Sequence, residues 1–104
     1  MIVVIMIKSF KHKGMERFFF EGRAKGIKAD HVKKIRQVLT VLDAARELDD
    51  IKSVIPLRCH SLTGHRKKEH AVWVNKNWRI TFIFDDGNVY LTNYEDYHDG
   101  KLRR

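Results

Sequence analysis

The side chains best suited to acid–base chemistry lie in the second half of the chain. His60 follows a short apolar segment, Arg79 lies in an alternating segment, and Asp96, Tyr97 and His98 are consecutive near the C-terminus. Cleavage of a phosphodiester by a neighbouring hydroxyl requires a base for the hydroxyl proton, an acid for the leaving oxygen and a cation for the added negative charge. Together these five side chains could meet all three requirements without a metal ion.

The individual roles within this set stay open at the level of sequence. Imidazole titrates near neutral pH, so His60 or His98 suits the base. Asp96 suits either a base or a partner that holds a histidine in one tautomer, and Tyr97 suits a hydrogen bond to phosphate or stacking on a base. Each residue also has an ordinary interpretation: His60 as an isolated buried or surface histidine, Arg79 as a solvent-facing cation, and 96–98 as an exposed polar chain end.

The charge of the chain favours a polyanionic partner. Lys and Arg outnumber Asp and Glu by 21 to 13 in 104 residues, which gives a net charge of +8. A surplus of this size on a small body favours nucleic acid, an anionic membrane surface or an acidic protein, although it could also serve solubility alone. The basic residues concentrate in 1–34 and 58–79, and two such blocks can form one phosphate-tracking face after folding. Arg66, Lys67 and Lys68 are predicted to contact the RNA backbone.

The cysteine and histidine pattern predicts neither a metal site nor a cofactor. Cys59 is the single cysteine, so no internal disulfide framework is expected and a reducing, cytoplasmic location is favoured. Cys59 and His60 are adjacent on a predicted strand and should point to opposite faces, and their distances along the chain to His65 and His70 do not match a zinc motif.

The apolar N-terminus is predicted to be neither a membrane span nor a signal peptide. Its apolar run, MIVVIMI, has seven residues, whereas a spanning helix needs about 20. A signal peptide carries positive charge before its apolar run, but Lys8 and Lys11 come after this one. We therefore predict one domain over 1–104, with 1–5 as an extension, 99–104 as a tail and no membrane partner.

Periodicity predicts an α+β fold in which an N-terminal strand and two helices pack on an antiparallel sheet. The three phenylalanines at 18–20 are interpreted as core, in a segment that favours a short helix but could also form a strand. Trp73 and Trp78 are interpreted as core or sheet-packing residues rather than as stacking platforms for bases. The expected order is a strand over Ile2–Phe10, a helix over Met15–Glu21, a longer helix from an Asp30 N-cap to about Leu48 that Asp49 and Asp50 end, and strands over Leu57–Leu62, His70–Val74, Trp78–Phe84 and Val89–Tyr94, with a turn at 85–88.

Several motifs along the chain resemble the HigB branch of the RelE superfamily of toxins. The most specific are Val-Asn-Lys-Asn-Trp-Arg at 74–79 and Asp-Tyr-His at 96–98. Arg-Cys-His-Ser-Leu-Thr-Gly at 58–64, Ile-Lys-Ser-Phe-Lys-His-Lys-Gly at 7–14 and Leu-Asp-Ala-Ala at 42–45 accompany them in the same order. The resemblance covers about residues 6–98. It implies a RelE-like fold and a metal-independent endoribonuclease that cleaves mRNA in the A site of the 70S ribosome and is neutralised by a HigA-like helix-turn-helix antitoxin.

The resemblance also assigns residues. It implies His60, Asp96, Tyr97 and His98 as catalytic positions, and it places Arg79 near the phosphate, where a planar and permanently charged fork is suitable. Asn77 joins Arg66, Lys67 and Lys68 as a predicted RNA-binding residue. Thr63 departs from the pattern, because related toxins often have lysine there. Two alternatives stay open: a non-catalytic basic module that binds RNA or the ribosome, and a toxin-like partner that acts mainly as a co-repressor.

Overall fold

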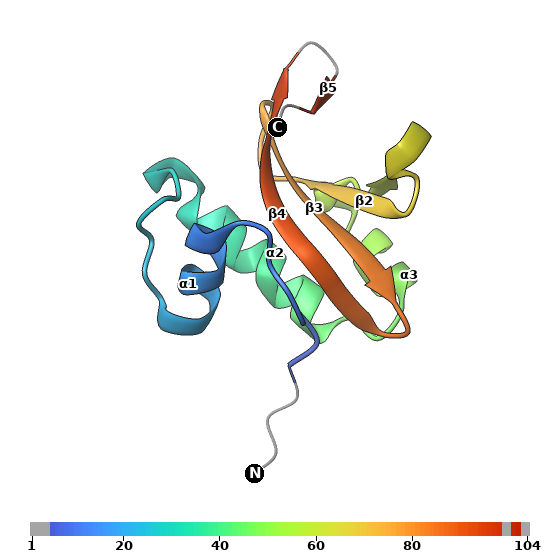
Figure 1. The fold of residues 1–104 in the computed structure, drawn as a ribbon, viewed down its shortest axis with the longest axis horizontal. Coiled ribbons are helices and arrows are strands. Elements are labelled where there is room, and N and C mark those ends of the chain that lie inside the picture. The colour runs from blue at the N-terminus through green and yellow to red at the C-terminus, as the bar shows by residue number, and fades with distance from the viewer. Residues whose placement is uncertain (1–4, 99–100, 103–104) are drawn as a thin grey trace.

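The computed structural model describes residues 5–98 and 101–102, and these form an α+β fold (Figure 1). Its α-helices are α1 (Lys13–Glu21), α2 (Val32–Ala44) and α3 (Leu48–Lys52), with 3-10 turns η1 (Ala29–His31), η2 (Ile55–Leu57) and η3 (Gly64–Arg66). Its strands are β1 (His60–Ser61), β2 (Glu69–Trp73), β3 (Trp78–Asp85), β4 (Asn88–His98) and β5 (Lys101–Leu102), and all neighbouring strands are antiparallel in the order β1-β2-β3-β4-β5. The predicted fold class is confirmed.

The predicted N-terminal strand is wrong as a continuous element. Residues 2–4 lie outside the described residues, and the remainder makes two isolated parallel bridges to β4, from Ile7 to Val89 and from Phe10 to Thr92. The interruption has a local cause, because Leu91 of β4 has a φ of 54° and the pairing of β4 with β3 shifts nearby. A segment that follows a bulged strand cannot maintain a regular ladder with it.

Helix α1 confirms the predicted short helix and starts two residues earlier. Its first turn is capped by His12, whose Nδ1 accepts a hydrogen bond of 3.0 Å from the Met15 backbone N–H. It ends at Gly22, where a φ of 73° allows the backbone N–H to bond the Phe18 carbonyl. Of the three phenylalanines interpreted as core, Phe18 is buried, but Phe20 is 54% exposed and that assignment is wrong.

The longer helix differs from its prediction at both ends. Asp30 lies inside η1 and does not cap α2, whose N-cap position is occupied by His31. The helix ends at Ala44, and a separate helix α3 follows. Asp50 lies in the first turn of α3 rather than ending α2, and it completes a capping box there, because its carboxylate accepts hydrogen bonds from the backbone N–H groups of Arg46 and Glu47 at 2.9 and 3.1 Å. Three α-helices are thus present in the described chain, not the two expected.

One face of the sheet is covered by the helices. Figure 1 shows α1 beside α2 on one side of the strands, with α2 extending behind β4. The predicted alternation of β3 is confirmed, since Ile80 and Phe82 are fully buried on this side, in one core cluster with Ile35 and Leu42 of α2. Because successive side chains of a strand point to opposite sides, the residues between the buried ones lie on the opposite face of the sheet.

The strands of the second half are close to their predicted ranges, with two differences. The strand expected over 57–62 is reduced to β1, because η2 extends to Leu57 and Arg58 after it has a left-handed backbone that interrupts an extended segment. The last strand is longer than expected: β4 continues through His98 and pairs with β5, so Asp96 and Tyr97 lie inside a strand and not beyond its end. In the described part of the chain, no helix has the length and apolar character needed to cross a membrane.

Candidate active site

The face of the sheet opposite the helices, called the open face below, gathers three of the predicted catalytic residues. Directly paired residues of neighbouring strands point to the same side of a sheet. Trp73 pairs with Arg79, and Arg79 pairs with Glu95, so these three form one row across β2, β3 and β4. Tyr97 follows Glu95 by two residues and shares its side. His60 of β1 joins the same face because it pairs with Ala71, two residues before Trp73.

Arg79 is held rigidly within this row. Its Nη1 donates hydrogen bonds to the backbone carbonyls of Asn75 and Trp78 at 2.7 and 3.1 Å. The guanidinium carbon lies 5.1 Å from the ring centre of Trp73 and 4.1 Å from that of Tyr97. The residue is only 7% exposed, and burial lowers the pKa of its guanidinium. A cation stacked on two rings keeps its charge, and low exposure strengthens its interaction with any phosphate that comes near.

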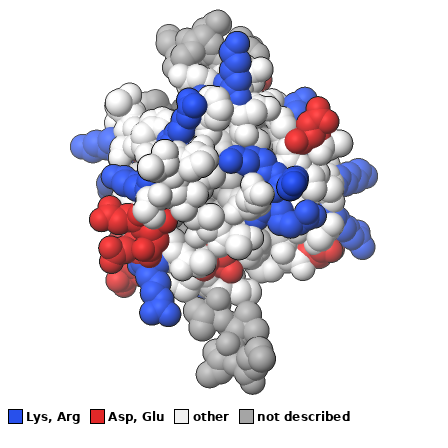
Figure 2. Space-filling view, turned by 180° about the vertical axis from the view of Figure 1, so that it is seen from behind, with Lys and Arg blue, Asp and Glu red and all other residues white. Residues whose placement is uncertain are grey.

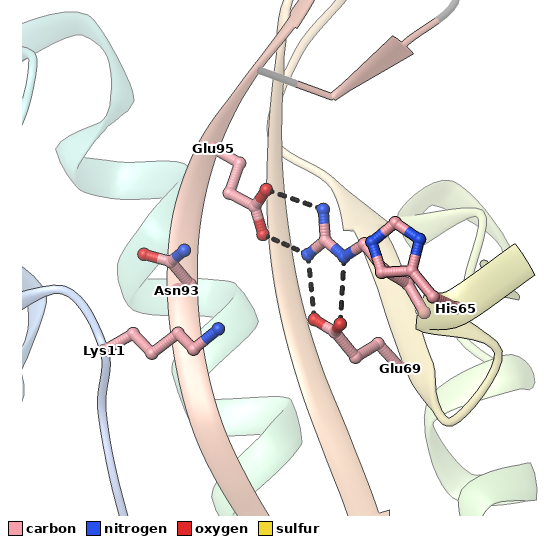
Figure 3. Close-up of a pocket in the computed structure, with 6 residues that line it drawn as sticks. Lys11, His65, Glu69, Asn93 and Glu95 are labelled. Atoms are coloured by element: carbon pink, nitrogen blue, oxygen red, sulfur yellow. Dashed lines mark hydrogen bonds and ion pairs between the residues drawn. The ribbon is translucent and has the colours of Figure 1, made fainter. Parts of the chain in front are cut away.

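A buried ion-pair network occupies the neighbouring part of the open face (Figure 3). Arg66 donates to Glu69 through Nε and Nη2 at 2.9 and 2.8 Å, and to Glu95 through Nη1 and Nη2 at 3.0 and 2.6 Å. The Thr81 hydroxyl also donates to Glu95. The two carboxylates raise the pKa of Arg66, and Arg66 in turn lowers the pKa of Glu69. Arg66 was predicted to bind RNA, and here both edges of its guanidinium face protein carboxylates.

The same network borders a hollow of about 430 Å³ on the open face. Figure 3 shows Lys11 and Asn93 on one side of it and His65 on the other. Glu95 is 5% exposed and sits directly beside Arg79 in the strand pairing, but its carboxylate bonds Arg66 instead. Among the described residues, no carboxylate forms an ion pair with Arg79. Within this part of the chain, Arg79 is therefore a positive charge without a carboxylate partner.

His60 is exposed, and one of its ring nitrogens is already engaged. Its Nδ1 lies 3.0 Å from the backbone carbonyl oxygen of Arg58. A carbonyl only accepts hydrogen bonds, so Nδ1 carries the proton of the neutral ring and Nε2 keeps a free lone pair. From the strand spacing, the Cα atoms of His60 and Arg79 are about 12 Å apart, a gap that an RNA segment can bridge.

The structure separates the three consecutive residues at the end of β4. Asp96 pairs with Trp78, which packs against the core, so Asp96 points to the helix side while Tyr97 points to the open face. His98 belongs to β4, and its side chain lies outside the described part of the structure. The strand thus brings Tyr97, and not Asp96, onto the face of His60 and Arg79.

The other predicted RNA-binding residues lie at the surface. Lys67 and Lys68 are exposed in the turn between η3 and β2. Asn77 is exposed in the connection between β2 and β3, where its backbone N–H donates to the Asn75 side chain at 2.8 Å and its carbonyl accepts from the Tyr97 N–H at 2.5 Å. Thr63, the departure from the family pattern, is exposed just before η3.

Sequence reasoning missed Arg58 and Trp73 as parts of this face. The Arg58 guanidinium carbon lies 4.0 Å from the ring centre of Trp73, on the same ring that contacts Arg79. Trp73 packs on the sheet as expected, but between two cations. The only signal in the sequence was that a basic residue lies two positions before His60. Its side-chain direction could not be predicted, because it depends on a backbone conformation that is rare for arginine.

Basic and acidic side chains are unevenly distributed over the surface (Figure 2). Seen from behind the view of Figure 1, Lys and Arg side chains are scattered over the surface in several groups, while the largest group of Asp and Glu side chains gathers at one edge (Figure 2). Within the described residues, no group of three or more His, Cys, Asp or Glu side chains could hold a metal ion. Cys59 is half-buried, and burial raises the pKa of its thiol.

Comparisons with known proteins agree on one family. The HigB-like toxins, described as the RelE-like toxin of type II toxin-antitoxin system HigB, match residues 8–98. Endoribonuclease HigB of Proteus vulgaris is 43% identical over 93 residues, which cover 89% of this chain and 100% of that protein. Toxin HigB-1 of Vibrio cholerae serotype O1 is 30% identical over 94 residues, which cover 89% of this chain and 98% of that protein.

Proposed function

The chain belongs to the HigB-like family of RelE-like toxins of type II toxin–antitoxin systems, and from this premise we propose that it is an endoribonuclease that cleaves mRNA on the ribosome. The name of the Proteus vulgaris relative supports the activity. The family implies an antitoxin partner, and we propose that this partner is a HigA-like helix-turn-helix protein. We also propose a cytoplasmic location, because mRNA on ribosomes is found there.

The observation that carries the proposal is the common face of His60, Arg79 and Tyr97. His60 has a free Nε2 lone pair, which suits removal of the 2′-hydroxyl proton. Arg79 is a fixed cation with no ion-pair partner among the described residues, which suits the negative charge that develops on the phosphate. Tyr97 covers Arg79 and can hydrogen-bond to phosphate or stack on a base. His98, at the end of β4, is the proposed source of the proton for the leaving 5′ oxygen. Asp96 points to the helix side, so it is proposed to act through its neighbours and not on the RNA directly.

Ribosome dependence is proposed because the described residues of the open face supply charge and acid–base groups, whereas a partner can supply the geometry of the substrate. The ribosome would hold the mRNA in a defined geometry, and the toxin would supply the reacting groups. Exposed Lys67, Lys68 and Asn77 are proposed to contact RNA at the edges of the face. This division of labour predicts fast cleavage only on engaged mRNA.

The test measures single-turnover cleavage of an mRNA bound to programmed 70S ribosomes and compares it with cleavage of the same mRNA without ribosomes. Wild-type protein should cut the ribosome-bound message much faster. His60→Ala and His98→Ala should each lose about 10²–10⁴-fold in rate while they still bind ribosomes and melt at the wild-type temperature. Equal cleavage of free and bound mRNA would contradict ribosome dependence. Ribosome binding without any cleavage by the wild-type protein would support the alternative of a non-catalytic RNA-binding module.

A further inference from the structure

Arg58 is placed as if it were part of the candidate active site. Arg58, Trp73, Arg79 and Tyr97 alternate as cation, ring, cation and ring, with distances of 4.0, 5.1 and 4.1 Å between successive members. Three of these side chains come from neighbouring strands, whereas Arg58 reaches the row from the loop before β1. Arg79 is largely buried in the row, and Arg58 is its exposed end.

The backbone at Arg58 adopts an unusual conformation that aims two groups at once. Its φ of 50° and ψ of 46° are left-handed, a region that a non-glycine residue occupies rarely and at some cost in energy. The preceding turn η2 sets it, since the Arg58 N–H donates to the Ile55 carbonyl at 3.0 Å. In this conformation the side chain lies over Trp73 while the carbonyl bonds Nδ1 of His60. Arg58 therefore orients the His60 ring through its backbone carbonyl and supplies an exposed cation through its side chain.

The charge of Arg58 is available to a ligand. Within the described part of the chain, no carboxylate forms an ion pair with Arg58. The face of Trp73 orients the guanidinium and reduces the entropy that the side chain loses on binding. A guanidinium with a free edge binds phosphate oxygens through two parallel hydrogen bonds.

We propose that Arg58, held on Trp73, forms a second phosphate subsite of the RNA-binding face, for the phosphodiester next to the one that is cleaved. This inference rests on the proposed function, because its ligand is the same RNA strand. Arg58 binds the strand at the exposed end of the row, and Arg79 acts on the reacting phosphate. The Arg58 carbonyl makes Arg58 a positioning residue for His60 as well.

The subsite is tested with Arg58→Met and Trp73→Leu, beside Lys33→Met as a matched control. Lys33 is an exposed cation on α2, so its loss changes net charge equally. In single-turnover cleavage, Arg58→Met should raise the half-saturating substrate concentration roughly 10-fold or more, as expected for a lost charge-assisted hydrogen bond, with a smaller change in maximal rate. It should also reduce the slope of log affinity against log salt by about 0.7, the value for one phosphate on a single strand. Trp73→Phe should retain most of the affinity that Trp73→Leu loses.

The positioning role is tested by two further substitutions of the same residue. Arg58→Gly removes the side chain but favours the left-handed backbone, whereas Arg58→Val removes the side chain and disfavours that backbone. Arg58→Val should therefore lose maximal rate that Arg58→Gly keeps, and the 15N chemical shifts of His60 should show the Nδ1–H tautomer in Arg58→Gly but a mixture in Arg58→Val.

The outcomes separate this inference from the proposed function. If the wild-type protein does not cleave RNA, the proposed function fails. If the wild-type protein cleaves and His60→Ala does not, but Arg58→Met matches Lys33→Met in affinity and salt slope, then only the phosphate subsite is overturned. Equal maximal rates for Arg58→Gly and Arg58→Val would overturn the positioning role.

A separate set of hydrogen bonds supports Arg79 from the helix side. Asn75 Oδ1 accepts from the backbone N–H groups of Asn77 and Trp78 at 2.8 and 3.0 Å, which fixes the orientation of its amide. Its Nδ2 therefore faces His31 and donates to Nε2 at 2.7 Å, while Nδ1 of His31 bonds the Tyr94 hydroxyl. His31 is only 6% exposed, so this arrangement requires a neutral ring.

The hydrogen bonds of the Asn75 side chain fix the loop between β2 and β3, and the backbone carbonyls of this loop hold Arg79. The Arg79 Nη1 bonds the Asn75 and Trp78 carbonyls, and it lies 3.4 Å from that of Lys76. We infer that His31 and Asn75 are positioning residues for Arg79, since they fix the loop that fixes the guanidinium.

A double-mutant cycle distinguishes this role from a general loss of structure. Asn75→Ala should reduce the maximal cleavage rate in the wild-type background, but it should cause little further loss in an Arg79→Ala background, because its effect passes through Arg79. Lys76→Ala, an exposed change in the same loop, is the control. Equal losses from Asn75→Ala in both backgrounds would refute the inference, and the melting temperature of each variant shows whether folding contributes.

Discussion

Replacing Arg66 by methionine should strongly destabilise the protein. The change leaves the carboxylates of Glu69 and Glu95 close together without the cation that both now bond. Removing one partner of a buried ion pair typically costs about 3–5 kcal/mol. Arg66 and Glu69 are each 18% exposed and Glu95 is 5% exposed, so water screens only part of the repulsion. At about 4–8 °C per kcal/mol for a domain of this size, the melting temperature should fall by about 12 °C or more.

The size of this effect should depend on pH. Arg66 lowers the pKa of Glu69 in the folded protein, so the wild-type pair stabilises the fold above the ordinary value of 4.5, and this contribution is lost as pH falls through the lowered pKa. In Arg66→Met the two carboxylates repel each other instead, and acid relieves the repulsion by protonating one of them. The difference in stability between the two proteins should therefore be largest near neutral pH and shrink toward about pH 4.

The assay is urea and thermal unfolding at both pH values, with Lys67→Met as the control. Lys67 is the exposed neighbour of Arg66, so its loss removes the same charge without breaking the network. Adding Glu95→Gln to Arg66→Met should restore part of the stability, because it removes the buried charge that was left unpaired. An Arg66→Met protein as stable as Lys67→Met, but weaker in RNA binding, would refute the structural role and return Arg66 to the RNA-contacting set.

Three further predictions concern other parts of the molecule. Replacing Lys67 and Lys68 by glutamate should weaken ribosome binding and flatten its salt dependence without changing the melting temperature, and an unchanged salt titration would show that this turn is only solvated. Gly14→Ala should destabilise by about 1 kcal/mol net, because a Cβ there would lie 2.9 Å from a ring carbon of His12, a clash that outweighs the gain in helix propensity; a higher melting temperature than wild type would contradict this. Burial lowers the pKa of His31, so its contribution to stability is complete above 6.5 and is lost as pH falls toward the lowered pKa. Thermal melts should therefore show a smaller loss between about pH 7.5 and pH 5 in His31→Gln than in wild type, and equal losses would exclude His31 as the cause.

The parts of the fold that sequence could predict are those with a clear local period. The alternation of Trp78 to Phe84 correctly assigned the buried and open sides of β3, because a strand has one buried face at every second residue. Ile35, Leu39 and Leu42 recur at steps of three or four residues, and this helical period indicates the side of α2 that is buried. Neither pattern depends on the rest of the chain.

The errors lie where distant residues or local backbone geometry decide the outcome. Asp30 and Asp50 are both good capping residues by type, and only the structure shows that Asp50 caps a third helix while Asp30 lies in a 3-10 turn. The bulge at Leu91 could not be predicted from sequence. Leucine rarely adopts a left-handed backbone, so its presence there does not indicate one. The long-range bonds of Arg66 to Glu95 span 29 positions, a distance at which periodicity carries no information.

The resemblance named the residues of the candidate site but not their arrangement in space. The resemblance named His60, Arg79 and Tyr97, and the strand pairing brings these three to one face. It also named Asp96, and the same pairing places that residue on the helix side. Alternation along a strand is strict, so consecutive residues of one motif cannot share a face while β4 stays extended.

The open face carries two kinds of arginine, and their difference decides what it can bind. Arg66 lies between two carboxylates, so its charge is cancelled at short range. Arg58 and Arg79 lie against aromatic rings, which stabilise a cation without neutralising it. A phosphate that reaches this face meets two positive charges that are already oriented, and preorganised charge of this kind stabilises a transition state without further rearrangement. If Glu95 were bonded to Arg79 instead of Arg66, the composition and the net charge of +8 would be unchanged, but the charge at the proposed reacting position would be neutralised. The pairing of the arginines, and not their number, therefore decides how much positive charge this face can offer a phosphate.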